Sequence, residues 1–198
     1  MCGNGGIVVN DWHGIPDMPD LTIRIKKKSD GSAALSCIRA DGTTTWQQQN
    51  GKLGRFFPLH DLTHYAVESV LGFRNAFYGL VAAGWDLTDF ASTGPRGRIP
   101  PEALCAEVVV GYFDLERATG VLGTAEGLNA RLDEFHADNK LAVPELRCSE
   151  DQVHHIRRVR GDLFARWNAV APGDALVLHF ERNAEPVAAP DTNHRTPA

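Results

Sequence analysis

The residues with the clearest capacity for chemistry lie in one run, LHDLTHYAVE, at positions 59–68. Within it, His60, His64 and Glu68 follow one another at intervals of four residues. In an α-helix such residues lie one above the other and share one face. Two imidazoles one turn apart can hold one ion, as in the HExxH helix of zinc proteases. The spacing therefore predicts a divalent-metal site, most compatible with Zn²⁺, on His60 and His64.

The carboxylates of the same run are the candidates for the rest of the site. Glu68 is the candidate third ligand, although a carboxylate here could instead orient a ligating imidazole without touching the metal. Asp61 occupies the position that Glu holds in HExxH and is the candidate catalytic base, acting on a metal-bound water. A place in the first helical turn, where a carboxylate is favoured, explains Asp61 equally well.

On this predicted helix, the face that carries the histidines and Glu68 lies nearly opposite the apolar face. The apolar residues are Leu59, Leu62, Ala66, Val70 and Phe73. Their centre lies about 160° from the His/Glu face on a helical wheel. His60, His64 and Glu68 therefore either meet solvent as an ordinary polar face or line a cleft formed with another element.

Two family resemblances rest on the same residues. The segment HDLTH resembles the zinc motif of the ubiquinone-biosynthesis assembly-factor family, which reads HDxxH and adds a glutamate further along. His60, Asp61 and His64 match that motif, and Ala76 stands at the position of the glutamate. The resemblance implies zinc and an all-helical fold, but this chain begins with predicted strands, so we do not transfer that family's function. The pair His60-Asp61 is also similar to the metal motif of HD-type phosphohydrolases, which requires an upstream helical histidine; the upstream histidine here is His13, in an irregular leader.

A further ligand could come from another helix. Glu107 lies in the apolar run of residues 103–110, and buried carboxylates in proteins are usually paired or metal-bound. The interpretation we favour places Glu107 with Asp114 on the exposed stripe of an amphipathic helix. Under that interpretation neither carboxylate belongs to the site.

Arg160 is the candidate substrate-binding residue. On the helical wheel it falls among the apolar residues Val153, Ile156, Phe164 and Trp167. A guanidinium directed toward packed structure pairs with a carboxylate or binds an anionic ligand. An internal salt bridge is the simpler interpretation, and a small anionic substrate is the functional one.

The elements that must position these residues can be predicted from periodicity. Alternating runs at 21–26, 33–38 and 43–47 are separated by Asp-Gly turns and predict a β-meander, and residues 175–180 predict a closing strand. Helical spacing predicts helices over residues 58–72, 73–83, 101–119, 125–137 and 149–167. The expected fold is α+β, with the meander and the C-terminal strand forming a small antiparallel sheet packed against a helical bundle. We expect an irregular leader over residues 1–20, one domain over 21–182 and a disordered tail over 183–198.

Composition excludes several classes of protein. The 198 residues carry 20 Lys and Arg against 25 Asp and Glu, so a general nucleic-acid binder is not expected. No apolar run is long enough for a membrane span, and no secretion signal is recognisable. The 4 cysteines lack CxxC spacing, which favours free thiols in a cytoplasmic protein.

Taken together, the residues favour a cytoplasmic metal-binding protein, and metal-dependent hydrolysis is the simplest reaction for such a site. Whether the chain is an enzyme stays open, because no complete reaction motif is present. The alternative is a non-catalytic module that binds a small or anionic ligand, or a protein partner, on the same polar face.

Overall fold

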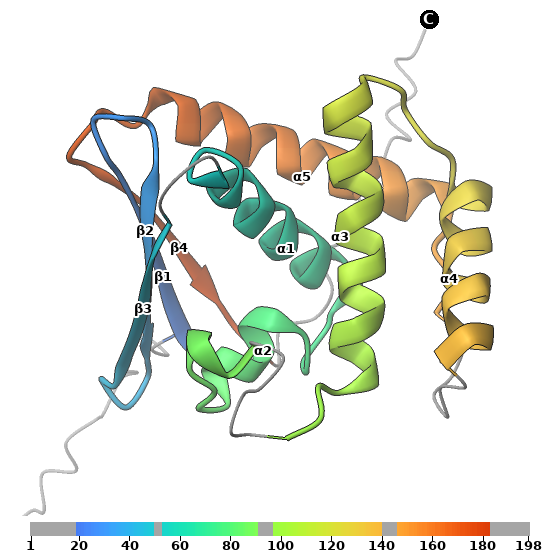
Figure 1. Ribbon diagram of the computed structural model, residues 1–198, viewed down its shortest axis with the longest axis horizontal. Coiled ribbons are helices and arrows are strands. Elements are labelled where there is room, and N and C mark those ends of the chain that lie inside the picture. The colour runs from blue at the N-terminus through green and yellow to red at the C-terminus, as the bar shows by residue number, and fades with distance from the viewer. Residues whose placement is uncertain (1–18, 50–52, 91–96, 140–145, 183–198) are drawn as a thin grey trace, which may run out of the picture.

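The computed structural model describes residues 19–49, 53–90, 97–139 and 146–182 (Figure 1). Its sheet is antiparallel, with the strand order β3-β2-β1-β4. The strands are β1 (Leu21–Lys27), β2 (Ala33–Arg39), β3 (Thr44–Gln49) and β4 (Ala175–Phe180). The predicted α+β fold, with a meander completed by a C-terminal strand, is therefore confirmed.

The period-two alternation of the strands creates one apolar face. In β1, Leu21, Ile23 and Ile25 are fully buried, whereas Arg24 and Lys26 are exposed on the opposite face. The β1–β2 and β2–β3 turns each contain a glycine with a left-handed backbone, φ 80° at Gly31 and φ 82° at Gly42. Tight hairpin turns require such a conformation, and glycine adopts it without a steric penalty.

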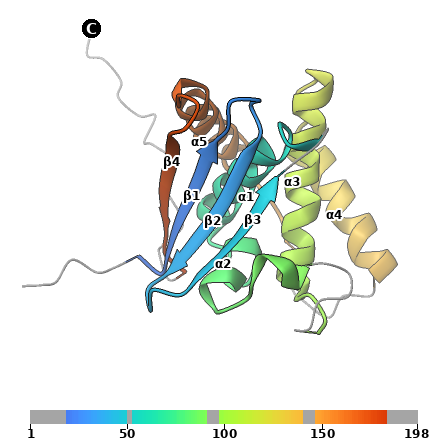
Figure 2. The same ribbon diagram turned by 60° about the vertical axis from the view of Figure 1, so that its left-hand side comes forward.

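All the described helices lie on the apolar side of this sheet (Figure 2). They are α1 (Phe57–Leu71), α2 (Phe77–Ala82), a 3-10 helix (Leu87–Phe90), α3 (Pro101–Thr119), α4 (Ala125–Asn139) and α5 (Glu150–Ala169). Ser149 and Gln152 form a capping box at the start of α5. The other face of the sheet exposes side chains such as Trp46 and Val177.

Helix α1 is the centre of the fold. It packs against both α3 and α5, and its Leu62 and Ala66 are fully buried (Figure 1). The Tyr65 hydroxyl donates to the carbonyl oxygen of His179 at 2.7 Å, which ties α1 to β4. Because α1 is held on several sides, the residues along it have fixed neighbours.

The helix predicted over residues 73–83 is shorter in the structure. Gly72 ends α1 in a left-handed conformation with φ 68°, and α2 begins only at Phe77. The amides of Arg74 and Asn75 donate to the Glu102 carboxylate on α3 instead of entering a helix. A tertiary partner therefore overrides the helical spacing of this segment.

Three further expectations concern the two ends of the chain, its cysteines and membrane-spanning helices. The predicted tail, and the predicted leader apart from Pro19 and Asp20, lie outside the described residues. Within the described part, Cys37, Cys105 and Cys148 are free. None of the described helices combines the length and the apolar character needed to cross a bilayer.

Candidate metal centre

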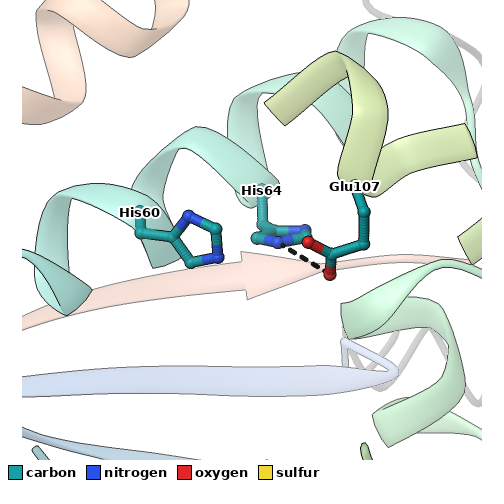
Figure 3. A group of neighbouring side chains, drawn as sticks. All are labelled: His60, His64 and Glu107. Carbon is teal, nitrogen blue, oxygen red and sulfur yellow. Dashed lines mark ion pairs between the residues drawn. The ribbon is translucent and has the colours of Figure 1, made fainter. Parts of the chain in front are cut away.

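His60 and His64 come together with a carboxylate from another helix. Ligand atoms of His60, His64 and Glu107 all lie within 4.8 Å of one another. The His64 Nε2 atom is 3.3 Å from Glu107 Oε1, and the two imidazole rings lie 4.8 Å apart at an interplanar angle of 80°. Figure 3 shows the rings on α1 and the Glu107 carboxylate on α3 directed toward one another. The group could hold a metal ion.

The Nδ1 atom of each imidazole also contacts a carboxylate. His60 Nδ1 is 2.7 Å from Asp114 Oδ2, and His64 Nδ1 is 3.3 Å from Glu68 Oε1. Asp114 also accepts a hydrogen bond at 3.2 Å from Arg117 Nη2. These contacts occupy Nδ1 of both rings and leave Nε2 of each for the centre. Metal-ligating histidines in proteins commonly have this arrangement.

Glu68, the predicted third ligand, is not part of the group of converging ligand atoms. Its side chain is fully buried, and Oε2 accepts hydrogen bonds from the backbone amides of Tyr78 at 2.9 Å and Gly79 at 3.4 Å. Oε1 faces Nδ1 of His64, the ring nitrogen directed away from Glu107. The structure thus places Glu68 where it can orient His64, which is the second role that the sequence allowed.

The interpretation that places Glu107 and Asp114 together on an exposed helical stripe is only half right. The side chain of Glu107 is 56% exposed, but its carboxylate faces His64, whose side chain is 2% exposed. Asp114 lies two turns further along the same face of α3, and its side chain is only 11% exposed. Their spacing indicated a shared face, but the sequence contained no signal that this face meets α1.

Aromatic rings flank the two imidazoles. The Phe56 ring stacks on His60 at 5.3 Å between centroids, and Phe77 lies 5.2 Å from His64. Phe77 in turn packs against Phe90 at 4.8 Å. The site therefore has apolar walls beside its ligands and an exposed carboxylate, Glu107, on its outer side.

The charges of the site shift the pKa values of its members. Burial alone would lower the pKa of His64, but the hydrogen bonds and charges of Glu107 and Glu68 outweigh burial and raise it to about 10. Burial would raise the pKa values of Glu107 and Asp114, but the neighbouring histidines prevail and lower both. The group thus stabilises positive charge between its carboxylates, a property that also favours a bound cation.

Asp61, the predicted base, lies beside the ligand group and not within it. Because α1 begins at Phe57, Asp61 belongs to the second turn, so the explanation that it sits in the first turn of the helix is wrong. Its carboxylate accepts a hydrogen bond from Gln49 Nε2 on β3. Burial raises the pKa of Asp61 to about 6, against the opposing effects of Gln49, His60 and His64.

Arg160, the predicted substrate-binding residue, makes internal contacts. Its guanidinium donates to the carbonyl oxygen of Phe113 at 2.6 Å and to Glu116 Oε2 at 3.4 Å. Arg157 binds the same Glu116 carboxylate. The structure does not bring Arg160 into the His60/His64/Glu107 group, and the internal salt bridge that the sequence also allowed is the arrangement observed.

The fold and the site together define an α+β protein with a candidate centre of two histidines and one carboxylate. No family model matches this chain, and neither a curated protein nor a solved structure matches it.

Proposed function

We propose that the protein binds a divalent metal ion through His60, His64 and Glu107, and that this ion is Zn²⁺. We further propose that the protein is a metal-dependent hydrolase. The observation that carries the proposal is the convergence of these ligand atoms within 4.8 Å of one another. A donor set of two histidines and one glutamate is one of those found in catalytic zinc sites. Such sites keep a coordination position for water or substrate, whereas structural zinc sites are closed by four protein ligands.

The chemistry follows from the residues around that position. A bound Zn²⁺ would lower the pKa of a coordinated water to about 7 and so supply a nucleophile at neutral pH. Asp61 is the proposed proton acceptor, because its raised pKa of about 6 lies near the working pH of a general base. Phe56 and Phe77 would limit access of bulk water to the ligands.

The first step of the test is metal content. Protein purified without a His-tag and equilibrated with Zn²⁺ is expected to retain about one equivalent after gel filtration, since one ligand group is proposed. The double variant His60→Ala/His64→Ala is expected to lose it, and Glu107→Gln to bind more weakly. His154→Ala is the matched control, because this histidine is exposed on α5 and, within the described part of the chain, forms its ion pair with Glu150 of the same helix. Equal metal content in wild type and double variant would overturn the proposal.

The second step is turnover. We expect the Zn²⁺-loaded protein to hydrolyse at least one member of a panel of chromogenic carboxylic esters, phosphate esters and anilides. Activity should disappear with a chelator and in His60→Ala/His64→Ala, and Asp61→Asn should lower kcat while retaining metal. If the protein binds metal but shows no chelator-sensitive turnover across the panel, the non-catalytic ligand-binding alternative replaces the hydrolase.

A further inference from the structure

The contacts behind the two imidazoles carry an inference that rests on the proposed metal site and deepens it. We propose that Glu68 and Asp114 are positioning residues, each of which forces one histidine to present Nε2 to the metal. Glu68 faces Nδ1 of His64, and Asp114 faces Nδ1 of His60. Neither carboxylate belongs to the ligand group itself.

The physical reason is the chemistry of a neutral imidazole. Such a ring has one N–H donor and one lone pair, and the partner of one nitrogen decides which is which. An ionised carboxylate can only accept a hydrogen bond. Placed against Nδ1, Glu68 and Asp114 therefore keep the proton on that nitrogen and leave the lone pair on Nε2, which faces the centre.

Glu68 is itself anchored by a third element. Its Oε2 accepts from the backbone amides of Tyr78 and Gly79 in the first turn of α2, and its side chain is fully buried. The carboxylate therefore cannot rotate away from His64 without leaving two amides unpaired in the interior, which is costly. In this way the position of α2 sets the orientation of a ligand on α1.

Asp114 performs the same task from α3. Its Oδ2 faces His60, while Oδ1 accepts from Arg117 Nη2 at 3.2 Å, so both carboxylate oxygens are engaged. Because α3 also carries Glu107, one helix supplies both a ligand and the group that orients another ligand. The relative position of α1 and α3 is therefore part of the site.

Two conservative variants separate orientation from packing. In Glu68→Gln, the amide oxygen can still accept from Tyr78 and Gly79, but the NH₂ group then faces His64 Nδ1 and favours the proton on Nε2. In Asp114→Asn, a single oxygen must serve both His60 and Arg117. We expect each variant to bind Zn²⁺ about 10–100-fold more weakly, the usual loss when an outer partner of a ligand is changed.

Glu102→Gln is the matched control for Glu68→Gln. The Glu102 carboxylate also accepts hydrogen bonds from two backbone amides, those of Arg74 and Asn75, and so ties α3 to the turn before α2. Among the described residues, the Glu102 carboxylate hydrogen-bonds to those amides and to no imidazole. We expect Glu102→Gln to bind Zn²⁺ with wild-type affinity even if its stability falls.

The NMR signal of the proton on Nδ1 distinguishes a positioning role from a role in packing, because a change in packing alone would not remove that proton. In the Co²⁺-substituted protein, the proton NMR spectrum should contain one hyperfine-shifted, exchangeable ring N–H signal for each ligating histidine. We expect Glu68→Gln to lose or displace the His64 signal, Asp114→Asn to do so for His60, and Glu102→Gln to retain both. Affinities are measured in parallel by competition with a chelator of known strength.

The outcomes distinguish the two proposals. If the wild-type protein binds neither Zn²⁺ nor Co²⁺, the proposed function fails, and the positioning roles fail with it. If the wild type binds but both variants keep its affinity and its ring N–H signals, the positioning roles are overturned while the metal site stands. Should Glu68→Gln fail to fold by circular dichroism, Asp114→Asn decides the matter, because its side chain is at the edge of the site and 11% exposed.

Discussion

His64 is the residue on which the chemistry of the site depends most. It lies between two carboxylates, with Glu107 at Nε2 and Glu68 at Nδ1, and its side chain is almost entirely buried. Although burial opposes the charged form, the two carboxylates raise its pKa to about 10. In the metal-free protein at neutral pH, a proton therefore occupies the nitrogen that the proposed metal ion would need. Binding of that ion would have to displace the proton, as it does at many histidine sites.

The same shift makes the stability of the metal-free protein depend on pH. The folded-state pKa of His64 is raised from 6.5 to about 10, so the folded state binds the proton more tightly than the unfolded state. The stabilisation is complete below pH 6.5 and is lost as the pH rises through the folded-state value. We expect the free energy of unfolding, measured by urea denaturation in the presence of chelator, to fall across this window.

The variant His64→Gln isolates this contribution. It removes the titrating group, so the difference in unfolding free energy between wild type and variant should shrink as the pH rises from 6.5 to about 10. Asp61 does not interfere, because its pKa is raised from 3.8 to about 6 and its own effect is lost below this window. A difference that stays constant across the window would contradict the assigned pKa shift.

At the scale of elements, two helical glycines lead to opposite expectations. A Cβ on Gly79 of α2 would collide with the backbone carbonyl of Arg74, whereas a Cβ on Gly111 of α3 would meet no atom of the described residues within 4 Å. Gly111→Ala should raise the free energy of unfolding by about 0.5–1 kcal/mol, because alanine favours helix. Gly79→Ala should lower it by about 1–3 kcal/mol, as overpacking does in close-packed interiors.

The same pair also tests how α2 affects the site. Since the amide of Gly79 donates to Glu68, a shift of α2 would disturb the carboxylate that holds His64. Gly79→Ala is therefore expected to weaken Zn²⁺ binding, while Gly111→Ala leaves it unchanged. Chelator competition on both proteins checks this, and equal affinities would show that α2 can move without disturbing His64.

Elements with a clear period could be predicted from sequence, and elements set by distant partners could not. The strands and the helices α3 and α5 follow from alternation, helical spacing and capping residues, all of which are local. The start of α2 depends on Glu102, which lies on another helix and removes the amides of Arg74 and Asn75 from helical bonding. No local pattern contains that information.

The candidate site also combines residues that could be predicted from local spacing with residues that only tertiary packing brings together. The pair His60 and His64 was predictable because both lie on one helix and their spacing fixes a common face. Glu107 and Asp114 come from α3, and only the packing of α3 on α1 brings them to the imidazoles. Glu68 was found by its spacing, but its role depends on the amides of α2.

At the scale of the whole molecule, the site joins segments that are distant in the chain. His60 and His64 lie on the central helix α1, and Glu107 lies on α3, so an ion bound by all three would link these helices. A ligand that binds only the folded state stabilises it by mass action, by about 2.7 kcal/mol at a free concentration of 100 times Kd. For a chain of this size, that corresponds to a rise in Tm of roughly 5–10 °C.

A thermal-shift series tests this linkage and separates the proposed functions. Zn²⁺ should raise the Tm of the wild type in a concentration-dependent way, a chelator should reverse the effect, and Glu107→Gln should reduce it, because Glu107 is the proposed ligand that comes from α3. His154→Ala should respond like the wild type, since its imidazole lies outside the group. If sulfate or phosphate raises the Tm while Zn²⁺ does not, the polar face of α1 binds anions instead.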